Sequence, residues 1–477
     1  MVRGKMNEWR LRFGRRWPRL FQAARRVVRA GVSMFWTARK AVEPLLRPVM
    51  VRLGRAYDIV PLQINCILSF MGVLPRLSGA TDPRRVVMVA YANLPHDPRI
   101  EREARALVEA GFDVTVICPT LDNDRERLLD WGAGITIETV KFSGGRFVFR
   151  WPGFVGDVLF EALLKYRPFA IHAHDLNMAF IAFAAARRNG AKVVVDFHEW
   201  FSENVELDVK AGSYVPLKPR WRRAYRWLER HSLAHADLVV TVCDSIADAM
   251  AVELGGGRRP HVVRNIPRLS IEPTRVYEPL KQSLGLPPDR FLLLYQGGLG
   301  PSRLIEPMIE ALGLADRCTL LIRGPHIQEF AEAYRAIAQR AGAADRLILQ
   351  GPVPSRDVVA AARGADAGIW SLPNLCRNFT FALPNKIFEY VAAGLPALVA
   401  DYPEARRLVE AHQLGLTFSP YDPASIADAI NRLIDDPALQ QQMARNTAAA
   451  LLALDAEREW ARLAELYLDL RKAPTVA

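Results

Sequence analysis

Short apolar runs alternate with longer amphipathic stretches from Arg85 onward. Continuous runs rich in β-branched residues are typical of strands that are buried on both faces of a parallel sheet. The predicted strands are 86–90, 114–117, 169–172, 193–195, 238–242 and 261–263 in the first half, and 291–295, 319–322, 347–349, 367–370 and 396–399 in the second. Between them, the stretch 99–110 has helical spacing and ends at Gly111, as helices often end at glycine. This alternation predicts two doubly wound α/β sheets.

A proline-rich segment predicts the boundary between the two halves of the chain. Residues 265–290 contain five prolines and no sustained period, which is typical of a linker. We expect a basic amphipathic extension (1–80), an N-terminal Rossmann-like domain (84–268), a linker (269–290), a C-terminal Rossmann-like domain (291–440) and C-terminal helices (441–477).

The charge is concentrated at one end of the chain. The formal net charge of the 477 residues is +12, and residues 1–55 hold fifteen Lys or Arg against two acidic residues, Glu8 and Glu43. Trp17, Phe21 and Phe35 lie among these cations at helical spacing, which favours a helix in an anionic membrane interface at about 1 kcal/mol per basic residue. The alternative is a solvated basic tail. The apolar stretch 59–74 is interrupted and short, so we expect a second interfacial or packing segment and not a membrane span.

The cysteines argue for a reducing compartment. The five cysteines are scattered and never spaced as C-x-x-C, so neither a disulfide framework nor a zinc ribbon is expected. Together with the basic segment, this predicts a cytoplasmic protein associated peripherally with the inner face of a membrane.

Two segments of the second half carry residues suited to a diphosphate. Pro384–Asn385 can begin a helix, with Lys386 and Glu389 on one face, so that the lysine binds phosphate while the carboxylate accepts hydrogen bonds from vicinal hydroxyls. A surface ion pair is the alternative reading of these two residues. The turn 296–303 follows a predicted strand and is rich in glycine, which frees backbone amides for an anion, although such a turn is also common as a simple structural loop.

Seven segments, taken in order, resemble the family 4 (group 1) glycosyltransferases over about residues 84–470. They are Asp97-Pro98-Arg99, Ala173-His174-Asp175, 195–199, Asn265-Ile266-Pro267, Gly297-Gly298-Leu299, 350–353 and 383–390. The resemblance implies the GT-B architecture, in which two Rossmann-like domains face each other across a cleft and the last helix crosses back to the first domain. It also implies a metal-independent retaining transfer from a nucleotide-diphosphate sugar, with no tightly bound cofactor.

The resemblance also implies roles for individual residues. Glu389 matches the glutamate that binds the ribose, Arg303 and Lys386 match donor-phosphate cations, and His174 matches a histidine near the reacting sugar. The expected catalytic residues are His174, Glu389, Lys386 and Arg303. The expected donor-nucleotide residues are Gly297, Gly298, Arg303, Arg323, Gly351, Val353, Asn385, Lys386 and Glu389. The expected acceptor-side residues are His96, Asp97, Arg99, Asp175, His198 and Glu199.

The chain departs from the family pattern in the N-terminal glycine-rich loop, which is replaced by Asn93-Leu94-Pro95-His96-Asp97, and at two positions of the second half. Phe381 stands where the family has the first glutamate of a pair, and Gly298 stands where an arginine is usual. The predicted function is transfer of a sugar to a membrane-proximal or lipid-linked glycan acceptor. Two alternatives stay open, a catalytically degenerate membrane-associated scaffold and a GT-B sugar-nucleotide epimerase. A nucleic-acid partner is not expected, because the basic segment contains no recognition module and the rest of the chain is close to neutral.

Overall fold

The computed structural model describes residues 65–92, 94, 97–119, 130–140, 157–208, 213–267 and 273–472. By their contacts, the residues group into two units. Among the described residues, one unit comprises those up to Asp196, His235–Leu238 and those from Leu468 onward, and the other comprises those of Phe197–Ala234 and Val239–Tyr467. The predicted basic amphipathic helix within residues 1–55 and the acceptor-side candidate His96 lie outside the described residues.

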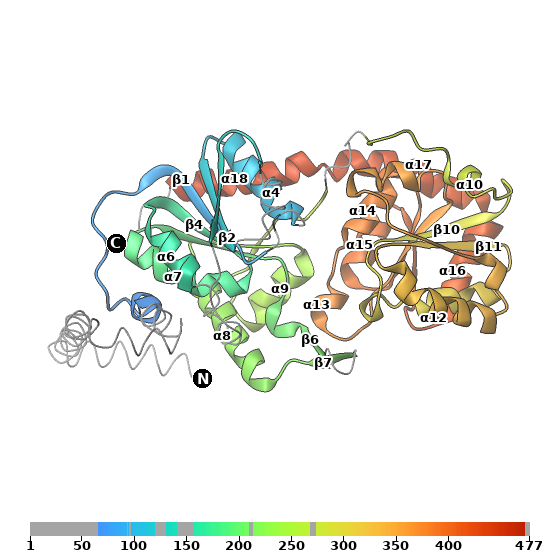
Figure 1. The fold of residues 1–477 in the computed structure, drawn as a ribbon, viewed down its shortest axis with the longest axis horizontal. Coiled ribbons are helices and arrows are strands. Elements are labelled where there is room, and N and C mark those ends of the chain that lie inside the picture. Colours follow the sequence, from blue (N-terminus) through green and yellow to red (C-terminus); the bar gives the residue numbers. More distant parts are fainter. Residues whose placement is uncertain are drawn as a thin grey trace, which may run out of the picture. The chain divides into compact units, whose positions relative to one another are not determined.

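The first parallel sheet has the strand order of a doubly wound fold, β3-β2-β1-β4-β5-β8-β9. Figure 1 labels its strands β1, β2 and β4. Its strands are β1 (Asp82–Val89), β2 (Asp113–Pro119), β3 (Ile135–Val140), β4 (Pro168–His174), β5 (Lys192–Phe197), β8 (Leu238–Thr241) and β9 (His261–Val262). In the register, Val86 of β1 lies opposite Val114 of β2 on one side and Ala170 of β4 on the other. The six strands predicted in this half are confirmed, whereas β3 was not predicted.

Helices follow the strands of this sheet, as the alternation predicts. They are α4 (Pro98–Glu109), α6 (Asp157–Leu164), α7 (Leu176–Asn189), α8 (Pro219–His235) and α9 (Asp244–Glu253). Between β5 and α8 the chain forms the short helix η3 (Phe201–Glu203) and an antiparallel hairpin of β6 (Val205–Asp208) and β7 (Ser213–Pro216). The predicted helix 99–110 is therefore α4, which begins at Pro98, where the missing N–H of proline costs nothing.

The second parallel sheet repeats the same order, β12-β11-β10-β13-β14-β15. Its strands are β10 (Phe291–Gln296), β11 (Cys318–Arg323), β12 (Leu347–Gln350), β13 (Ala367–Trp370), β14 (Ala397–Ala400) and β15 (Gly415–Phe418). The five strands predicted here are confirmed and the edge strand β15 was not predicted. In both sheets the strand order reverses beside the first strand, where open α/β sheets bind ligands at their carboxyl ends.

The second sheet is covered by helices on its faces (Figure 1). The α-helices in this part of the chain, not all of which pack on the second sheet, are α10 (Leu280–Ser283), α11 (Glu306–Glu310), α12 (Ile327–Arg340), α13 (Arg377–Thr380), α14 (Asn385–Ala392), α15 (Pro403–Ala411), α16 (Pro423–Asp435), α17 (Pro437–Ala453) and α18 (Ala456–Lys472). Short 3-10 helices are η4 (Pro301–Arg303), η5 (Ala311–Leu314), η6 (Ala344–Arg346), η7 (Ser355–Asp357) and η8 (Ala360–Ala362). The helix α10 lies inside the predicted linker, and its Leu280 is buried in one cluster with Leu292 of β10 and Tyr390 of α14.

The described part of the apolar stretch 59–74 packs on the first sheet's helices. Residues 65–70 are helical, and the Phe70 ring stacks on Phe180 of α7 with their centroids 4.2 Å apart. Arg188 of α7 donates to Asn65 Oδ1 at 3.2 Å. These residues thus form a packing segment, one of the two alternatives that the sequence leaves open.

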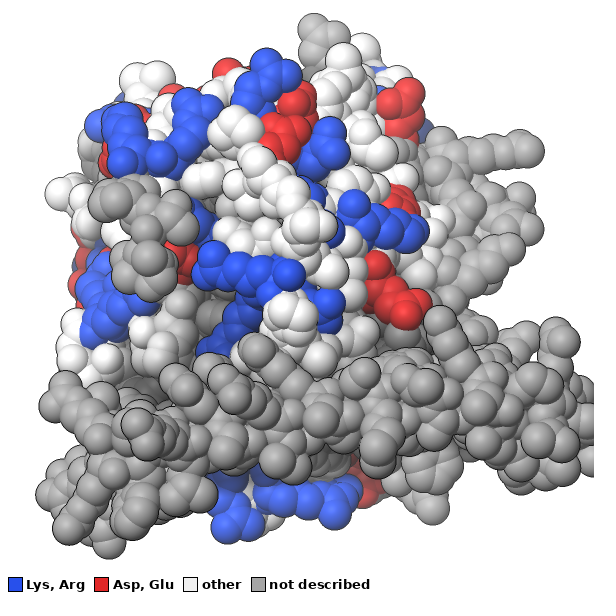
Figure 2. Space-filling view, turned by 90° about the vertical axis from the view of Figure 1, so that its left-hand side faces the viewer, with Lys and Arg blue, Asp and Glu red and all other residues white. Residues whose placement is uncertain are grey.

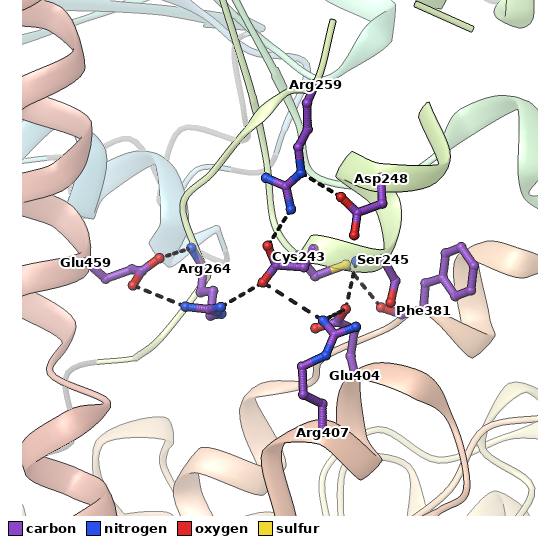
Figure 3. A network of polar contacts seen from close by, with 10 residues as sticks. Cys243, Ser245, Asp248, Arg259, Arg264, Phe381, Glu404, Arg407 and Glu459 are labelled. Carbon is purple, nitrogen blue, oxygen red and sulfur yellow. Dashed lines mark hydrogen bonds and ion pairs between the residues drawn. The ribbon is translucent and has the colours of Figure 1, made fainter. Parts of the chain in front are cut away.

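A network of ion pairs centred on Asp244 ties α9 to neighbouring elements of the second unit (Figure 3). The Asp244 carboxylate, at the first residue of α9, accepts from Arg259 at 2.6 Å and from Arg264 at 2.8 Å. The backbone N–H of Arg264 donates to Glu459 of α18, and Glu404 of α15 accepts from the backbone N–H of Ser245. Charge-assisted contacts therefore hold segments that lie far apart in the sequence.

Basic side chains are more frequent than acidic ones on the face shown in Figure 2. Among the helices that the structure describes, none combines the length and the apolar character needed to span a membrane.

Candidate functional site

A tight turn closes the carboxyl end of β10. Gly297 has φ +125°, a conformation that favours glycine, and a Cβ atom there would lie 2.4 Å from Lys386 Cε. A Cβ atom on Gly324, which follows β11, would lie 2.1 Å from the Gly297 carbonyl oxygen. Tyr295 donates a 2.7 Å hydrogen bond to the Gly298 carbonyl. The two glycines therefore let the backbones approach and let Lys386 lie directly against the turn.

The helix α14 brings Lys386 and Glu389 to this turn. It begins at Asn385, as predicted, and buries Ile387, Phe388, Tyr390 and Val391 on its inner face. The Tyr390 hydroxyl accepts a 3.2 Å hydrogen bond from the Gln296 N–H and donates one of 3.1 Å to the Ile369 carbonyl. Because Gln296 ends β10 and Ile369 lies in β13, these bonds fix α14 against both strands at the point where the strand order reverses.

Two cations lie at the turn, Lys386 and Arg303, and their positive charge is only partly neutralised by neighbouring groups. Burial first, and then the charge of Arg303, lower the pKa of Lys386 to about 8, while the Glu389 carboxylate acts in the opposite direction. Lys386 Nζ also lies 5.4 Å from the Tyr295 ring centroid. Arg303 Nε is buried and has no hydrogen-bond partner among the described residues. Two cations close enough to repel each other, one with a spare donor, form a site that an anion would stabilise.

Gln296, which the sequence analysis did not single out as a ligand residue, connects Glu389 to Arg323. Its Nε2 lies 3.4 Å from Glu389 Oε2, and its Oε1 accepts from Arg323 Nε at 3.2 Å. Burial raises the pKa of Glu389 against the opposing influence of Lys386, Gln296 and Arg323. The signal in the sequence was a polar residue between a buried apolar strand and a glycine turn.

The other residues expected at the nucleotide differ in exposure. Arg323 is 3% exposed, and its Nη1 donates to the Ala361 carbonyl at 3.0 Å, so its guanidinium is already committed to the protein. Gly351 is exposed and Val353 is half-buried in the segment after β12. The structure thus brings together Gly297, Gly298, Arg303, Lys386 and Glu389.

His174 lies in a buried charged cluster of the first unit. It ends β4, is 2% exposed, and its ring stacks on His172 with their centroids 4.3 Å apart. Its Nδ1 lies 3.8 Å from Asp196 Oδ2 and 4.0 Å from Glu103 Oε2. The neighbouring Asp175 adopts φ +65°, a conformation uncommon outside glycine. His174 and Asp175 therefore lie at a constrained end of β4, beside the point where the strand order of the first sheet reverses.

Arg99 holds the carboxylates of this cluster. It donates to both oxygens of Asp196, at 2.9 and 2.8 Å, and lies 2.9 Å from Glu103 Oε1. Nearby Asp97 caps α4 by accepting from the Arg99 N–H at 3.3 Å. The candidate ligand atoms of Glu103, His172, His174 and Asp196 lie within 4.8 Å of one another, a spacing that suits a metal ion. The Arg99 guanidinium already supplies positive charge to both carboxylates, so this donor set is poorly suited to a further cation.

The last two acceptor-side candidates belong to the second unit. His198 and Glu199 directly follow β5, and both are half-buried. Glu199 Oε2 accepts from Asn204 at 2.9 Å and from Asn378 at 3.2 Å. Asn378 also accepts from the Trp200 N–H at 2.9 Å, so it connects α13 to the segment after β5.

Comparisons with known proteins agree with this architecture. The family described as Glycosyl transferase 4-like domain matches residues 97–266, and the family described as Glycosyl transferases group 1 matches residues 276–450. The D-inositol 3-phosphate glycosyltransferase of Acidothermus cellulolyticus is 26% identical over 412 residues, covering 77% of this chain and 86% of that protein.

Two solved structures share the fold. The sucrose-phosphate synthase of Thermosynechococcus elongatus has a TM-score of 0.64 at 17% identity, covering 82% of this chain and 100% of that one. Anabaena Alr3699/HepE in complex with UDP-glucose has a TM-score of 0.58 at 17% identity, covering 80% and 98% of the respective chains. With both family matches spanning most of the chain, and with two parallel α/β sheets, the chain belongs to the family 4 (group 1) GT-B glycosyltransferases.

Proposed function

We propose that this glycosyltransferase moves a sugar, with retention of configuration, from a nucleotide-diphosphate sugar to a lipid-linked or membrane-proximal glycan. The donor site is the turn after β10 together with the start of α14. The acceptor side comprises Asp97, Asp175, His198 and Glu199, with Arg99 in a positioning role because its guanidinium bonds to Asp196 and Glu103.

The pairing of Arg303 and Lys386 at the Gly297 turn carries this proposal. The charge of Arg303 contributes to holding the Lys386 pKa near 8, and Arg303 Nε has no partner among the described residues. A donor diphosphate would accept from both side chains and remove their mutual repulsion. The solved structure of Alr3699/HepE, which shares the fold, contains UDP-glucose, and this supports a nucleotide sugar as the donor class.

Glu389 is the proposed ribose ligand. Its Oε1 and Oε2 can accept from two vicinal hydroxyls, and the Gln296 contact orients the carboxylate. Burial raises the pKa of Glu389, which shows that little water reaches the carboxylate, and the hydroxyls of a bound ribose would take the place of water there. Asn385, Gly298, Gly351 and Val353 would line the remainder of the nucleotide site.

In the proposed reaction, the bond from the sugar's anomeric carbon to the diphosphate oxygen breaks and the acceptor oxygen bonds to that carbon on the same face. Arg303 and Lys386 stabilise the negative charge that grows on the leaving diphosphate, which is the largest contribution expected at such a site. His174 orients the reacting sugar. The acceptor hydroxyl loses its proton to an acceptor-side group, for which His198 and Glu199 are the candidates.

Membrane association of residues 1–55 would place the enzyme near a lipid-linked acceptor at the cytoplasmic face. The basic excess of this segment supports the proposal, because anionic lipid attracts Lys and Arg. We expect the full chain to float with anionic vesicles at low salt and to float less at high salt, whereas the chain without residues 1–55 floats at neither. Salt-insensitive flotation would contradict an electrostatic association.

A donor screen followed by turnover tests the proposed activity. Thermal shift identifies which nucleotide sugar raises the melting temperature, since a ligand of the folded state stabilises it. Glu389→Ala should abolish that shift and the transfer, while Glu332→Ala, on the exposed face of α12, should leave both unchanged. Full transfer by Glu389→Ala would refute the assignment. Donor binding without glycoside formation would favour the scaffold that Phe381 leaves open, and epimerised free sugar nucleotide would favour the epimerase.

A further inference from the structure

A hollow in the second unit shares no lining residue with the nucleotide turn. It has a volume of about 530 Å³ and lies between the start of α8, the β6–β7 hairpin and the segment that leads into α13. Four arginines line it, three from α8 and one from α13: Arg222, Arg223, Arg226 and Arg377. None of the residues expected to bind the nucleotide belongs to its lining.

The arginines of the hollow exceed their carboxylate partners. Glu203 pairs with Arg222 and, at 3.3 Å, with Arg226. Glu253 pairs with Arg377 and, at 3.6 Å, with Arg226. Two glutamates are thus shared by three arginines, and Arg223 has no ion pair among the described residues. The four guanidinium groups and two carboxylates leave a charge of about +2, which matches a phosphate or diphosphate group.

Five further lining residues are apolar. Val205, Pro216, Leu217, Pro219 and Leu375 contribute aliphatic surface, and Leu375 is 44% exposed. A hollow lined by both arginines and aliphatic side chains fits an amphiphile whose charged group is joined to a hydrocarbon chain. A compact inorganic anion would use only the arginines.

A hydrogen bond links the hollow to the proposed acceptor side. Asn204 lines the hollow, and its amide donates to Glu199 Oε2 at 2.9 Å. Glu199 is one of the two candidates for accepting the acceptor's proton. An acceptor seated in the hollow by its phosphate would therefore lie close to a group suited to deprotonating its hydroxyl.

We propose that this hollow binds the phosphate or diphosphate headgroup of an amphiphilic, lipid-linked acceptor, with the adjoining hydrocarbon against Leu217 and Leu375. The inference deepens the proposed function, on which its acceptor role rests. Arg223, which has no ion pair within the described ranges, is the cation left for the ligand, and the apolar lining residues select for the chain attached to the phosphate.

Titration calorimetry with farnesyl diphosphate as the probe tests the site on the full-length protein. We expect saturable binding that Arg223→Glu weakens at least tenfold, with unchanged binding in the matched charge reversal Arg335→Glu on the exposed face of α12. Farnesol and inorganic pyrophosphate should each bind at least tenfold more weakly, because each lacks one half of the ligand. Melting temperatures of both variants establish that they are folded.

A variant of the nucleotide site distinguishes ligand binding in the hollow from ligand binding at the nucleotide turn. In a Lys386→Met variant, farnesyl diphosphate binding should persist while binding of the donor nucleotide sugar is weakened. Loss of farnesyl diphosphate binding in Lys386→Met, equal binding by Arg223→Glu, or equal binding of pyrophosphate would each overturn the proposal. Failure of the proposed transferase activity would appear instead as an absence of donor binding or turnover, with farnesyl diphosphate still bound.

Discussion

If Lys386 binds the donor diphosphate as proposed, we expect donor binding to depend on pH in a range where few other groups titrate. Its pKa of about 8 follows from burial and from the charge of Arg303, and both effects disfavour the ammonium form. A bound diphosphate favours that form and raises the pKa of Lys386 in the complex. Protonation and donor binding are therefore linked, and affinity should fall as the pH rises above 8.

The size of this effect follows from the displaced pKa. At pH 7 about nine in ten Lys386 side chains carry a proton in the free protein, and at pH 9 about one in ten does. If the complex keeps Lys386 charged throughout, the dissociation constant of the donor rises about tenfold between pH 7 and pH 9. This corresponds to about 1.4 kcal/mol. The neighbouring hydroxyls of Tyr295 and Tyr390 do not titrate in this range, because burial raises the pKa of each far above its usual value.

Calorimetric titration of the donor identified by thermal shift, at half-unit steps from pH 7 to pH 9, measures the effect. Lys386→Arg keeps its charge at every pH and should give a flat profile, while Lys386→Met should bind weakly at pH 7 and also show a flat profile. A flat profile for the wild type, or an equally steep one for Lys386→Arg, would refute the reasoning.

Three further variants probe the site and the fold. Glu389→Gln keeps the shape but loses the charge of the proposed ribose ligand, so we expect at least tenfold weaker donor binding and an unchanged melting temperature; a shift in melting temperature alone would instead indicate a structural role. Gly297→Ala introduces a Cβ against Lys386 and should weaken donor binding beyond any loss of stability of about 1 kcal/mol, whereas Gly342→Ala, also at positive φ but with open space around it, should cost stability alone. Asp244→Asn removes charge from the network of Figure 3 and should lower the free energy of unfolding in urea by about 1–2 kcal/mol at pH 7. Burial alone would raise the pKa of Asp244, but Arg259 and Arg264 hold it below the usual value. The difference in stability between wild type and variant should therefore shrink as the pH falls through that lowered pKa, and a constant difference would argue against the ion pairs.

The strands missed by the sequence analysis share one property. β3 and β15 lie at the edges of their sheets, and most of their residues are only half-buried. Edge strands do not need the continuous apolar run by which a central parallel strand is recognised, and β3, Ile-Thr-Ile-Glu-Thr-Val, alternates instead. The hairpin of β6 and β7 is likewise short and exposed at several positions. The central strands, which set the doubly wound order, were all recognisable.

The amino-acid sequence by itself determined the central strands of the two sheets, the helix that begins at Asn385, and the glycine turn with charged residues beside it. These features were recognisable because periodicity and turn residues act over a few neighbouring positions. Only the tertiary structure decided what each long charged side chain contacts. Arg99 and Arg323 were both expected at ligands, yet their guanidinium groups bond to Asp196 and Gln296 respectively. Arg303 instead keeps a buried donor that has no partner in the part of the chain that the structure describes. A guanidinium can reach many positions from one Cα, and its partner is selected by burial and by charges that lie far away in the sequence.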